Sequence, residues 1–88
     1  MSSPAVTVTV FSKPDDQCPQ CKATKYWLRK RDIDFEVIDI TVDEAALDRL
    51  KTLGHLRAPV VELTGIDGAQ VDVWSGHMDT KLKQHFGK

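Results

Sequence analysis

The chain has two cysteines, Cys18 and Cys21, which stand two residues apart in the run QCPQCKATKY. Residues of this type at this spacing can form a working redox pair, one half of a metal site or a structural disulfide. A structural disulfide here would close a very short loop, and short loops gain the least stabilisation from lost chain entropy. A structural zinc site needs four ligands, and the histidines show no ligand spacing. The pattern favours a redox pair and leaves open a metal site completed between two chains.

The composition fits one small globular domain over residues 1–88, with 41% hydrophobic and 28% charged residues. The net charge of -1 provides no basic excess for nucleic acid, and no apolar run is long enough to span a membrane. The start MSSPAV lacks the pattern of a signal peptide, and residues 1–4 are expected to form a loose tail. We therefore expect a cytoplasmic protein that binds neither nucleic acid nor a membrane. Stable structural disulfides are rare in that compartment, which again favours redox chemistry.

Hydrophobic periodicity predicts the elements that must position the cysteines. The expected strands are 6–11, 35–40, 60–63 and 70–74, and the expected helices are 19–31, 43–53 and 78–86. In chain order this is β-α-β-α-β-β-α. The first β-α-β should form a right-handed parallel unit, and Asp67-Gly68 marks a hairpin that adds antiparallel strands. We therefore expect an α/β fold in which three helices flank both faces of a four-stranded mixed sheet.

Particular residues are expected to set the ends of the helices. Pro19 suits the first turn of the first helix, where its missing N–H is not needed. Thr41 and Glu44 form a Thr-x-x-Glu capping box, and Gly54 is expected to end the second helix. Asp79 is expected to cap the last helix. The apolar positions that should pack from the second and third helices are Ala46, Leu47, Leu50, Leu53, Met78, Leu82 and Phe86.

The first helix is expected to have one face that differs from a basic face on the rest of its surface. Thr24, Trp27, Leu28 and Arg31 lie along the first of these faces. The basic face consists of Lys22, Lys25, Arg29 and Lys30. A charged face of this kind is usually only solvated, although it can also steer an acidic reductase or client. His55 and His85 are likewise expected to be surface residues.

Cys18 is predicted to lie at the N-terminus of the first helix, directly after the loop that follows the first strand. A thiol attacks only as its thiolate, and the unpaired N–H groups and partial positive charge of a helix N-terminus stabilise that anion. Lys13 and Lys22 are expected to add to this effect, whereas Asp15 and Asp16 oppose it. Cys18 is therefore predicted to be the nucleophile.

Cys21 is predicted to lie one turn into the helix, beneath the more exposed Cys18, and to act as the resolving thiol. Cys18 would attack a target disulfide, a mixed disulfide would form, and Cys21 would release the reduced target. Pro19 and Gln20, between the two cysteines, are expected to shape the turn and to tune the reduction potential. The strand-to-helix context makes the redox interpretation stronger than the cysteine spacing alone.

Three motifs follow one another along the chain: Cys18-Pro19-Gln20-Cys21, Ala58-Pro59-Val60-Val61 and Trp74-Ser75-Gly76. Together with the order of the elements, they resemble the thioredoxin superfamily and, more closely, the NrdH-redoxin branch of the glutaredoxins. The resemblance implies a thioredoxin/glutaredoxin-like fold and a small monomeric dithiol donor without a bound cofactor. Such proteins are reduced by thioredoxin reductase with electrons from NADPH. They reduce a protein disulfide, usually that of a class Ib ribonucleotide reductase.

The resemblance also implies roles for residues outside the cysteine pair. Pro59 matches the cis-proline of the superfamily, and the backbone of Ala58 is then expected to pair with the substrate. Trp74 is expected to lie near the active site, although core packing is the alternative for an aromatic residue in a strand. His77 is a candidate proton donor or client contact. The candidate partner-binding residues are Lys13, Pro19, Gln20, Ala58, Pro59, Trp74, Ser75, Gly76 and His77.

Some features of the chain depart from the family patterns. NrdH-redoxins continue Trp-Ser-Gly with Phe-Arg-Pro, whereas this chain continues with His77-Met78-Asp79, and its loop 13–17 is longer. Glutathione-using glutaredoxins carry Gly-Gly followed by two aspartates, and Gly76 and Asp79 match that pattern only in part. We therefore expect a poor glutathione site. A glutathione-dependent glutaredoxin, and a metal or iron–sulfur module that bridges two chains through Cys18, are the alternatives.

Overall fold

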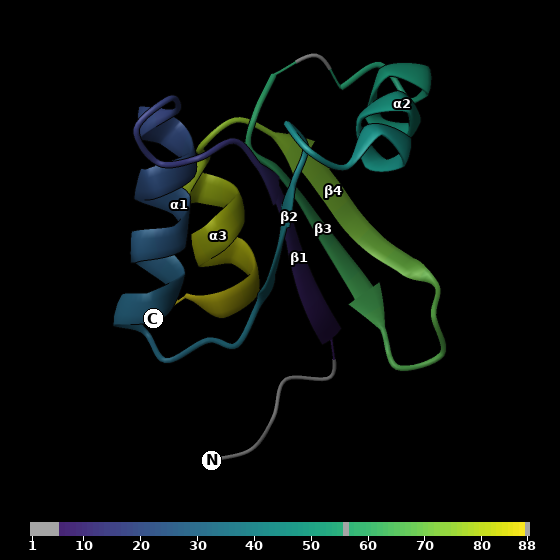
Figure 1. The fold of residues 1–88 in the computed structure, drawn as a ribbon. Coiled ribbons are helices and arrows are strands. Elements are labelled where there is room, and N and C mark those ends of the chain that lie inside the picture. The colour runs from purple at the N-terminus through teal and green to yellow at the C-terminus, as the bar shows by residue number, and fades with distance from the viewer. Residues whose placement is uncertain (1–5, 56, 88) are drawn as a thin grey trace.

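The computed structural model describes residues 6–55 and 57–87, so the expected loose tail 1–4 lies outside the described residues. The elements are β1 (Val6–Ser12), α1 (Pro19–Lys30), β2 (Glu36–Asp39), α2 (Glu44–Thr52), β3 (Val60–Gly65), β4 (Gln70–Ser75) and α3 (Asp79–Phe86). This is the predicted β-α-β-α-β-β-α order, with ends close to the predicted ones (Figure 1). None of the helices in the described ranges has the length and apolar character needed to cross a membrane.

The strands form one mixed sheet in the order β2-β1-β3-β4. β1 runs parallel to β2 and antiparallel to β3, so that Val10 pairs with Val37 on one side and with Val61 on the other. β3 and β4 form an antiparallel hairpin, in which Val61 pairs with Trp74. Gly68, at the hairpin turn, has a φ of 87°, a left-handed conformation that favours glycine. The predicted sheet and hairpin are therefore confirmed.

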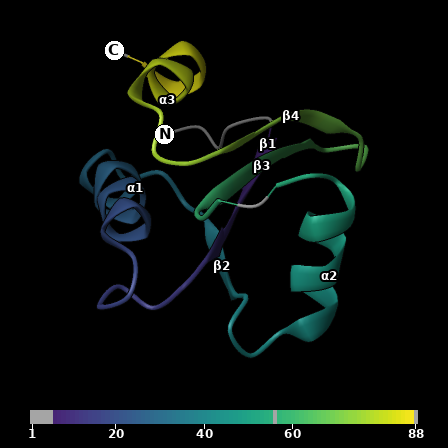
Figure 2. The same ribbon diagram turned by 90° about the horizontal axis from the view of Figure 1, so that it is seen from above.

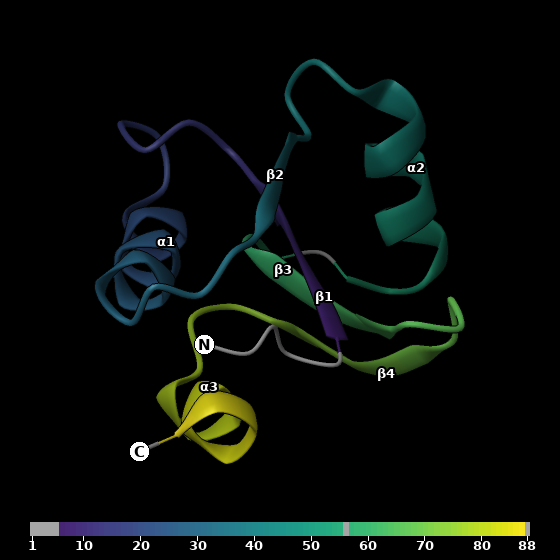
Figure 3. The same ribbon diagram turned by 90° about the horizontal axis from the view of Figure 1, so that it is seen from below.

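Helices cover both faces of the sheet, since side chains alternate between the faces along each strand. α1 and α3 lie on one face and α2 lies on the other (Figures 2 and 3). The core beneath α1 and α3 contains Val8, Val10, Trp27, Leu28, Val61, Leu63, Trp74 and Leu82. The core beneath α2 contains Phe11, Ile40, Leu50 and Val60. β1 and β3 contribute to both cores, which anchors the end of β1 before the cysteine loop and the start of β3 directly after Pro59.

The predicted N-terminal caps of α2 and α3 are wrong, whereas Gly54 follows the C-cap of α2 with a φ of 87°, as expected for a glycine that ends a helix. Asp43 is the N-cap of α2, and its carboxylate accepts a hydrogen bond from the Ala46 N–H at 3.0 Å. Thr41 instead donates its N–H and its hydroxyl to the Asp39 side chain, so it is engaged in the turn after β2. Asp79 is the first residue of α3 rather than its cap. In both places a neighbouring polar group competed successfully for the side chain that the sequence pattern assigned to the cap.

Two apolar and two histidine side chains differ from the predicted burial. Leu53 and Met78 are 54% and 38% exposed, because they cap the ends of α2 and α3, away from the buried turns of those helices. His55 and His85, expected at the surface, are half-buried, and each makes a side-chain hydrogen bond to a residue of β4. Polar side chains on β4 therefore hold both histidines by hydrogen bonds, one from the segment before β3 and one from α3.

Candidate redox site

Cys18 and Cys21 form a disulfide at the N-terminus of α1. Cys18 is the N-cap residue, and its Sγ accepts a hydrogen bond from the Cys21 N–H at 3.2 Å. Pro19 occupies the first turn, where a missing N–H leaves nothing unpaired. Cys21 is fully buried, whereas Cys18 is 8% exposed. In the reduced protein, the same N–H and the positive end of the helix would stabilise a thiolate on Cys18.

The segment that leads into β3 lies against Cys18. Its Ala58-Pro59 peptide bond is cis, in agreement with the prediction from the resemblance. The carbonyl oxygen of Ala58 lies 3.9 Å from Cys18 Sγ, although 40 residues separate the two in sequence. This carbonyl therefore forms one wall of the site, beside the cysteine that keeps some exposure.

The turn between β4 and α3 forms a second wall, at the same end of the sheet as the first turn of α1 (Figure 1). Gly76 has a φ of 84°, and its N–H donates to the Pro59 carbonyl oxygen at 2.7 Å. The His77 N–H donates to Gln20 Oε1 at 3.1 Å. A Cβ on Gly76 would lie 3.3 Å from Gln20 Oε1, so a glycine here permits the close approach. The structure thus brings all three motifs together.

The side chain of His77 joins α1 to α3. Its Nδ1 lies 2.8 Å from Thr24 Oγ1, and its Nε2 lies 2.7 Å from Asp79 Oδ1. Thr24 is fully buried and lies about one helical turn after Cys21. Asp79, which the sequence offered as a cap or a glutathione anchor, therefore binds a histidine that lies beside the cysteine helix.

Trp74 and Ser75 make their contacts elsewhere. Trp74 packs in the core beneath α1 and α3, and its ring stacks on that of His85, with centroids 5.8 Å apart. Ser75 Oγ lies 2.9 Å from His55 Nδ1. For Trp74, this is the core packing that the sequence left as the alternative. Gly76 is the member of the Trp-Ser-Gly motif whose backbone bonds to the cis-proline segment.

Lys13 lines a pocket of about 140 Å³ beside Ala58. The lining residues are Lys13, Ile40, Leu47, Leu50, Lys51, His55, Arg57, Ala58 and Val60. Lysine and arginine side chains therefore border an apolar floor near the cis-proline segment. Lys51 and Arg57 were not among the predicted site residues. Arg57 could have been predicted as a site residue from its position directly before Ala58, whereas no pattern in the sequence indicated Lys51.

Lys25 was expected on a solvated face, but it is 7% exposed and forms an ion pair with Asp15. The hydrogen bond from Lys25 lowers the pKa of Asp15 below its usual value. The Asp15 carbonyl oxygen also accepts the Cys18 N–H at 3.4 Å. Asp15 therefore helps to hold the loop before Cys18, and Lys25 balances the charge that we expected to oppose a thiolate.

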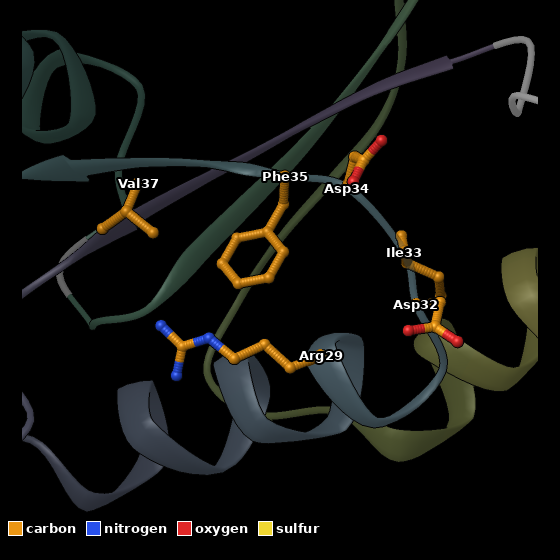
Figure 4. Close-up of a pocket in the computed structure, with 6 residues that line it drawn as sticks. All are labelled: Arg29, Asp32, Ile33, Asp34, Phe35 and Val37. Atoms are coloured by element: carbon orange, nitrogen blue, oxygen red, sulfur yellow. The ribbon is translucent and has the colours of Figure 1, made fainter.

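A larger pocket of about 440 Å³ lies at the opposite end of α1 (Figure 4). Arg29 of α1 and Phe35, directly before β2, face each other across it, with the guanidinium carbon 5.7 Å from the ring centroid. Neither cysteine lines this pocket. Over residues 6–55 and 57–87, no group of three or more His, Cys, Asp or Glu side chains is arranged to hold a metal ion. The candidate functional site is therefore the cysteine pair with its two walls.

Sequence comparisons agree with this geometry. The glutaredoxin family model matches residues 8–68. The glutaredoxin-like protein NrdH of Lactococcus lactis subsp. lactis is 37% identical over 54 residues, which cover 61% of this chain and 72% of that protein. The glutaredoxin-like protein NrdH of Escherichia coli K12 is 35% identical over 54 residues, which cover 61% of this chain and 64% of that protein.

Solved structures give the same result over a longer part of the chain. NrdH-redoxin from Escherichia coli, described as glutaredoxin-like with a thioredoxin-like activity profile, matches with a TM-score of 0.72 and 31% identity. That match covers 90% of this chain and 95% of the other. A glutaredoxin from Archaeoglobus fulgidus matches with a TM-score of 0.66 and 26% identity, covering 94% and 88% of the two chains. The chain therefore belongs to the glutaredoxin family and is an NrdH-like redox protein with a Cys-x-x-Cys disulfide.

Proposed function

We propose that the protein is a dithiol–disulfide oxidoreductase of the NrdH-redoxin type, with Cys18 as the nucleophile and Cys21 as the resolving thiol. Thioredoxin reductase would supply electrons from NADPH, and the client would be a protein disulfide, in the first place that of a class Ib ribonucleotide reductase. The cycle would run in the cytoplasm, in a monomer without a bound cofactor. The observation that carries the proposal is the N-cap position of Cys18, where the Cys21 N–H meets its sulfur at 3.2 Å.

The different surroundings of the two sulfurs support their different roles. Cys18 keeps a small exposed area and lies beside the Ala58 carbonyl, so a client disulfide can approach it along the cis-proline wall. Cys21 is fully buried in the first turn of α1, where a client sulfur has no access. A thiol in that place can still reach Cys18, because the two sulfurs already form a disulfide.

The cycle follows from thiol–disulfide exchange. The Cys18 thiolate attacks one sulfur of the client disulfide, so that a mixed disulfide forms and the other client sulfur leaves as a thiolate. The Cys21 thiol then loses its proton and attacks Cys18 Sγ, which forms the Cys18–Cys21 disulfide and releases the second client sulfur. The client gains two electrons and two protons. NADPH, through the reductase, returns two electrons to the protein and restores the dithiol.

A glutathione-dependent glutaredoxin is the second candidate. The observation that favours it is the pocket beside Ala58, because cations around a small cavity suit the carboxylates of a charged tripeptide. Lys13, Lys51 and Arg57 provide those cations. Asp79 weakens this candidate, since its carboxylate already pairs with His77 and is less available to glutathione.

A coupled assay of NADPH oxidation with a disulfide substrate distinguishes the two candidates. One arm contains thioredoxin reductase, and the other contains glutathione with glutathione reductase. The Cys18→Ser variant serves as the control for both arms. We expect turnover in the first arm and little in the second, and a class Ib ribonucleotide reductase is then tested as the client. Turnover in the glutathione arm alone would replace the proposed donor with glutathione.

A further inference from the structure

We propose that His77 is a positioning residue of the redox site, which fastens the first two turns of α1, and with them the cysteine pair, to the β4–α3 turn. The inference rests on the proposed redox role of Cys18 and Cys21. It does not depend on which reductase or client serves them.

His77 contacts α1 at two points that bracket Cys21. Its backbone N–H donates to Gln20 Oε1 at 3.1 Å, and Gln20 directly precedes Cys21. Its ring Nδ1 lies 2.8 Å from the hydroxyl of Thr24, about one turn after Cys21. One residue therefore holds the helix on both sides of the resolving cysteine. A shift of the first turn relative to the β4–α3 turn would break at least one of these bonds.

The Asp79 carboxylate determines which nitrogen of the His77 ring carries the proton. Its Oδ1 lies 2.7 Å from Nε2 of His77, and a carboxylate accepts hydrogen bonds, so we assign the proton to Nε2. In the neutral ring, Nδ1 is then the acceptor and the Thr24 hydroxyl donates to it. In the imidazolium form, Nδ1 donates and the same hydroxyl accepts. The contact between His77 and Thr24 is therefore compatible with both protonation states of the ring.

The burial of Thr24 makes this contact consequential. Its side chain is fully buried, so removal of the imidazole leaves a hydroxyl without its partner in the interior. A phenylalanine at position 77, the residue that the NrdH-redoxin pattern carries after Trp-Ser-Gly, has no group that can replace Nδ1. An asparagine places an amide close to where Nδ1 lies, but it cannot carry an imidazolium charge.

The link to the redox chemistry is the hydrogen bond from the Cys21 N–H to Cys18 Sγ, at 3.2 Å. Its direction is set by the orientation of the first turn of α1. A looser turn aims this N–H and the helix N-terminus less well at the sulfur, so a thiolate on Cys18 is stabilised less. The thiolate belongs to the reduced state. Loss of the His77 contact is therefore expected to make the disulfide harder to reduce and the Cys18 thiol less acidic.

The test compares His77→Phe, His77→Asn, Thr24→Val and the double variant His77→Phe/Thr24→Val. The redox equilibrium of the cysteine pair is measured against a dithiothreitol buffer, and the Cys18 thiol pKa is measured from the ultraviolet absorbance of the thiolate. We expect His77→Phe and Thr24→Val each to lower the equilibrium constant for reduction about fivefold, which corresponds to about 20 mV. Both should raise the thiol pKa. The double variant should change neither quantity further, and His77→Asn should restore most of the wild-type behaviour.

Several results would overturn the inference. They are wild-type values in both single variants, additive effects in the double variant, or an asparagine variant that behaves like phenylalanine. Thr52→Val, an exposed threonine at the end of α2, is the matched control and should leave both quantities unchanged. Thermal unfolding checks that each variant is folded. If His77→Phe folds poorly, Thr24→Val still tests the contact, because it nearly conserves side-chain volume. Because the measurement uses a small dithiol, failure of the thioredoxin reductase assay would reject the proposed donor and leave this test intact.

Discussion

At the scale of single residues, position alone makes two chemically identical side chains different. Cys18 lies at the helix N-cap and keeps a little exposure, whereas Cys21 is one turn deeper and fully buried. The Cys21 N–H points to Cys18 Sγ, which favours a thiolate on Cys18 in the reduced protein. The proposed roles of Cys18 as nucleophile and Cys21 as resolving thiol rest on this asymmetry.

Serine substitutions of the two cysteines should therefore have different results. Cys18→Ser is expected to abolish disulfide reduction, because no nucleophilic sulfur is left at the accessible position. Cys21→Ser is expected to accumulate a mixed disulfide with the substrate, because no thiol remains to resolve it. Coupled NADPH oxidation measures the first effect, and non-reducing electrophoresis with mass spectrometry measures the second. Full turnover by Cys18→Ser would exclude its assignment as the nucleophile.

The ion pair between the buried Lys25 and the exposed carboxylate of Asp15 gives a second prediction at this scale. Lys25→Met keeps most of the side-chain volume but removes the charge, so that Asp15 remains unpaired in the loop that holds Cys18. We expect the pKa of the Cys18 thiol to rise, because a negative charge then opposes the thiolate. Thiolate absorbance as a function of pH measures the shift. Lys30→Met, at the far end of α1, is the control, and equal shifts in the two variants would contradict the role of the ion pair.

At the scale of elements, the start of α2 shows how neighbouring polar residues compete for one role. Thr41 has the right spacing to Glu44 for a capping box, yet Asp39 takes its N–H and hydroxyl in the turn after β2. Asp43 then caps the helix through the Ala46 N–H. A cap residue must have extended backbone geometry directly before the helix, and Asp43 meets this condition.

Removal of the observed cap should therefore destabilise the protein, whereas removal of the glutamate of the predicted capping box should not. Asp43→Ala is expected to lower the free energy of unfolding by about 1 kcal/mol, because an N–H of the first turn loses its partner. Glu44→Ala is expected to stay within about 0.5 kcal/mol of the wild type. Urea unfolding followed by circular dichroism measures both. A larger loss in Glu44→Ala than in Asp43→Ala would restore the capping-box interpretation.

At the scale of the whole molecule, Asp72 connects the edge strand β4 to α3. Its Oδ2 lies 2.7 Å from Lys81 Nζ and 2.9 Å from His85 Nε2. These hydrogen bonds, chiefly the one from Lys81, lower the pKa of Asp72 from 3.8 to about 2. A carboxyl group whose pKa is lower in the folded than in the unfolded chain stabilises the fold at high pH. That contribution is lost as the pH falls through the folded pKa.

The stability of the protein should therefore depend on Asp72 in a pH-dependent way. Near neutral pH, Asp72→Asn is expected to lower the free energy of unfolding by on the order of 2 kcal/mol. The difference from the wild type should shrink as the pH falls from 3.8 to about 2, where the wild-type carboxyl also becomes neutral. Urea unfolding at a series of pH values measures this. Asp48→Asn, an exposed residue of α2, is the control, and a difference that is constant over this range would contradict the prediction.

The order of elements and the mixed sheet could be predicted from the sequence, because periodicity and turn signals are local. The alternating valines of β1 and the glycine of the β3–β4 turn each determine their own conformation within a few residues. Helix ends were less predictable. Leu53 has an apolar side chain at helical spacing, yet it lies at the cap and is exposed, since burial depends on where the sheet ends beneath the helix.

The sequence by itself determined the cysteine pair, its place at a helix start and, through the family resemblance, the cis Ala58-Pro59 bond. The tertiary structure decided which side chains surround that pair. Thr24 and His77 are 53 positions apart, and Cys18 and Ala58 are 40 positions apart. Contacts of this range depend on how the helices and loops meet at one end of the sheet, and neither spacing nor residue type encodes that geometry. Lys25 shows the consequence, because its helical position predicted a solvated charge, whereas in the structure Lys25 is buried and forms an ion pair with Asp15 of the loop before Cys18.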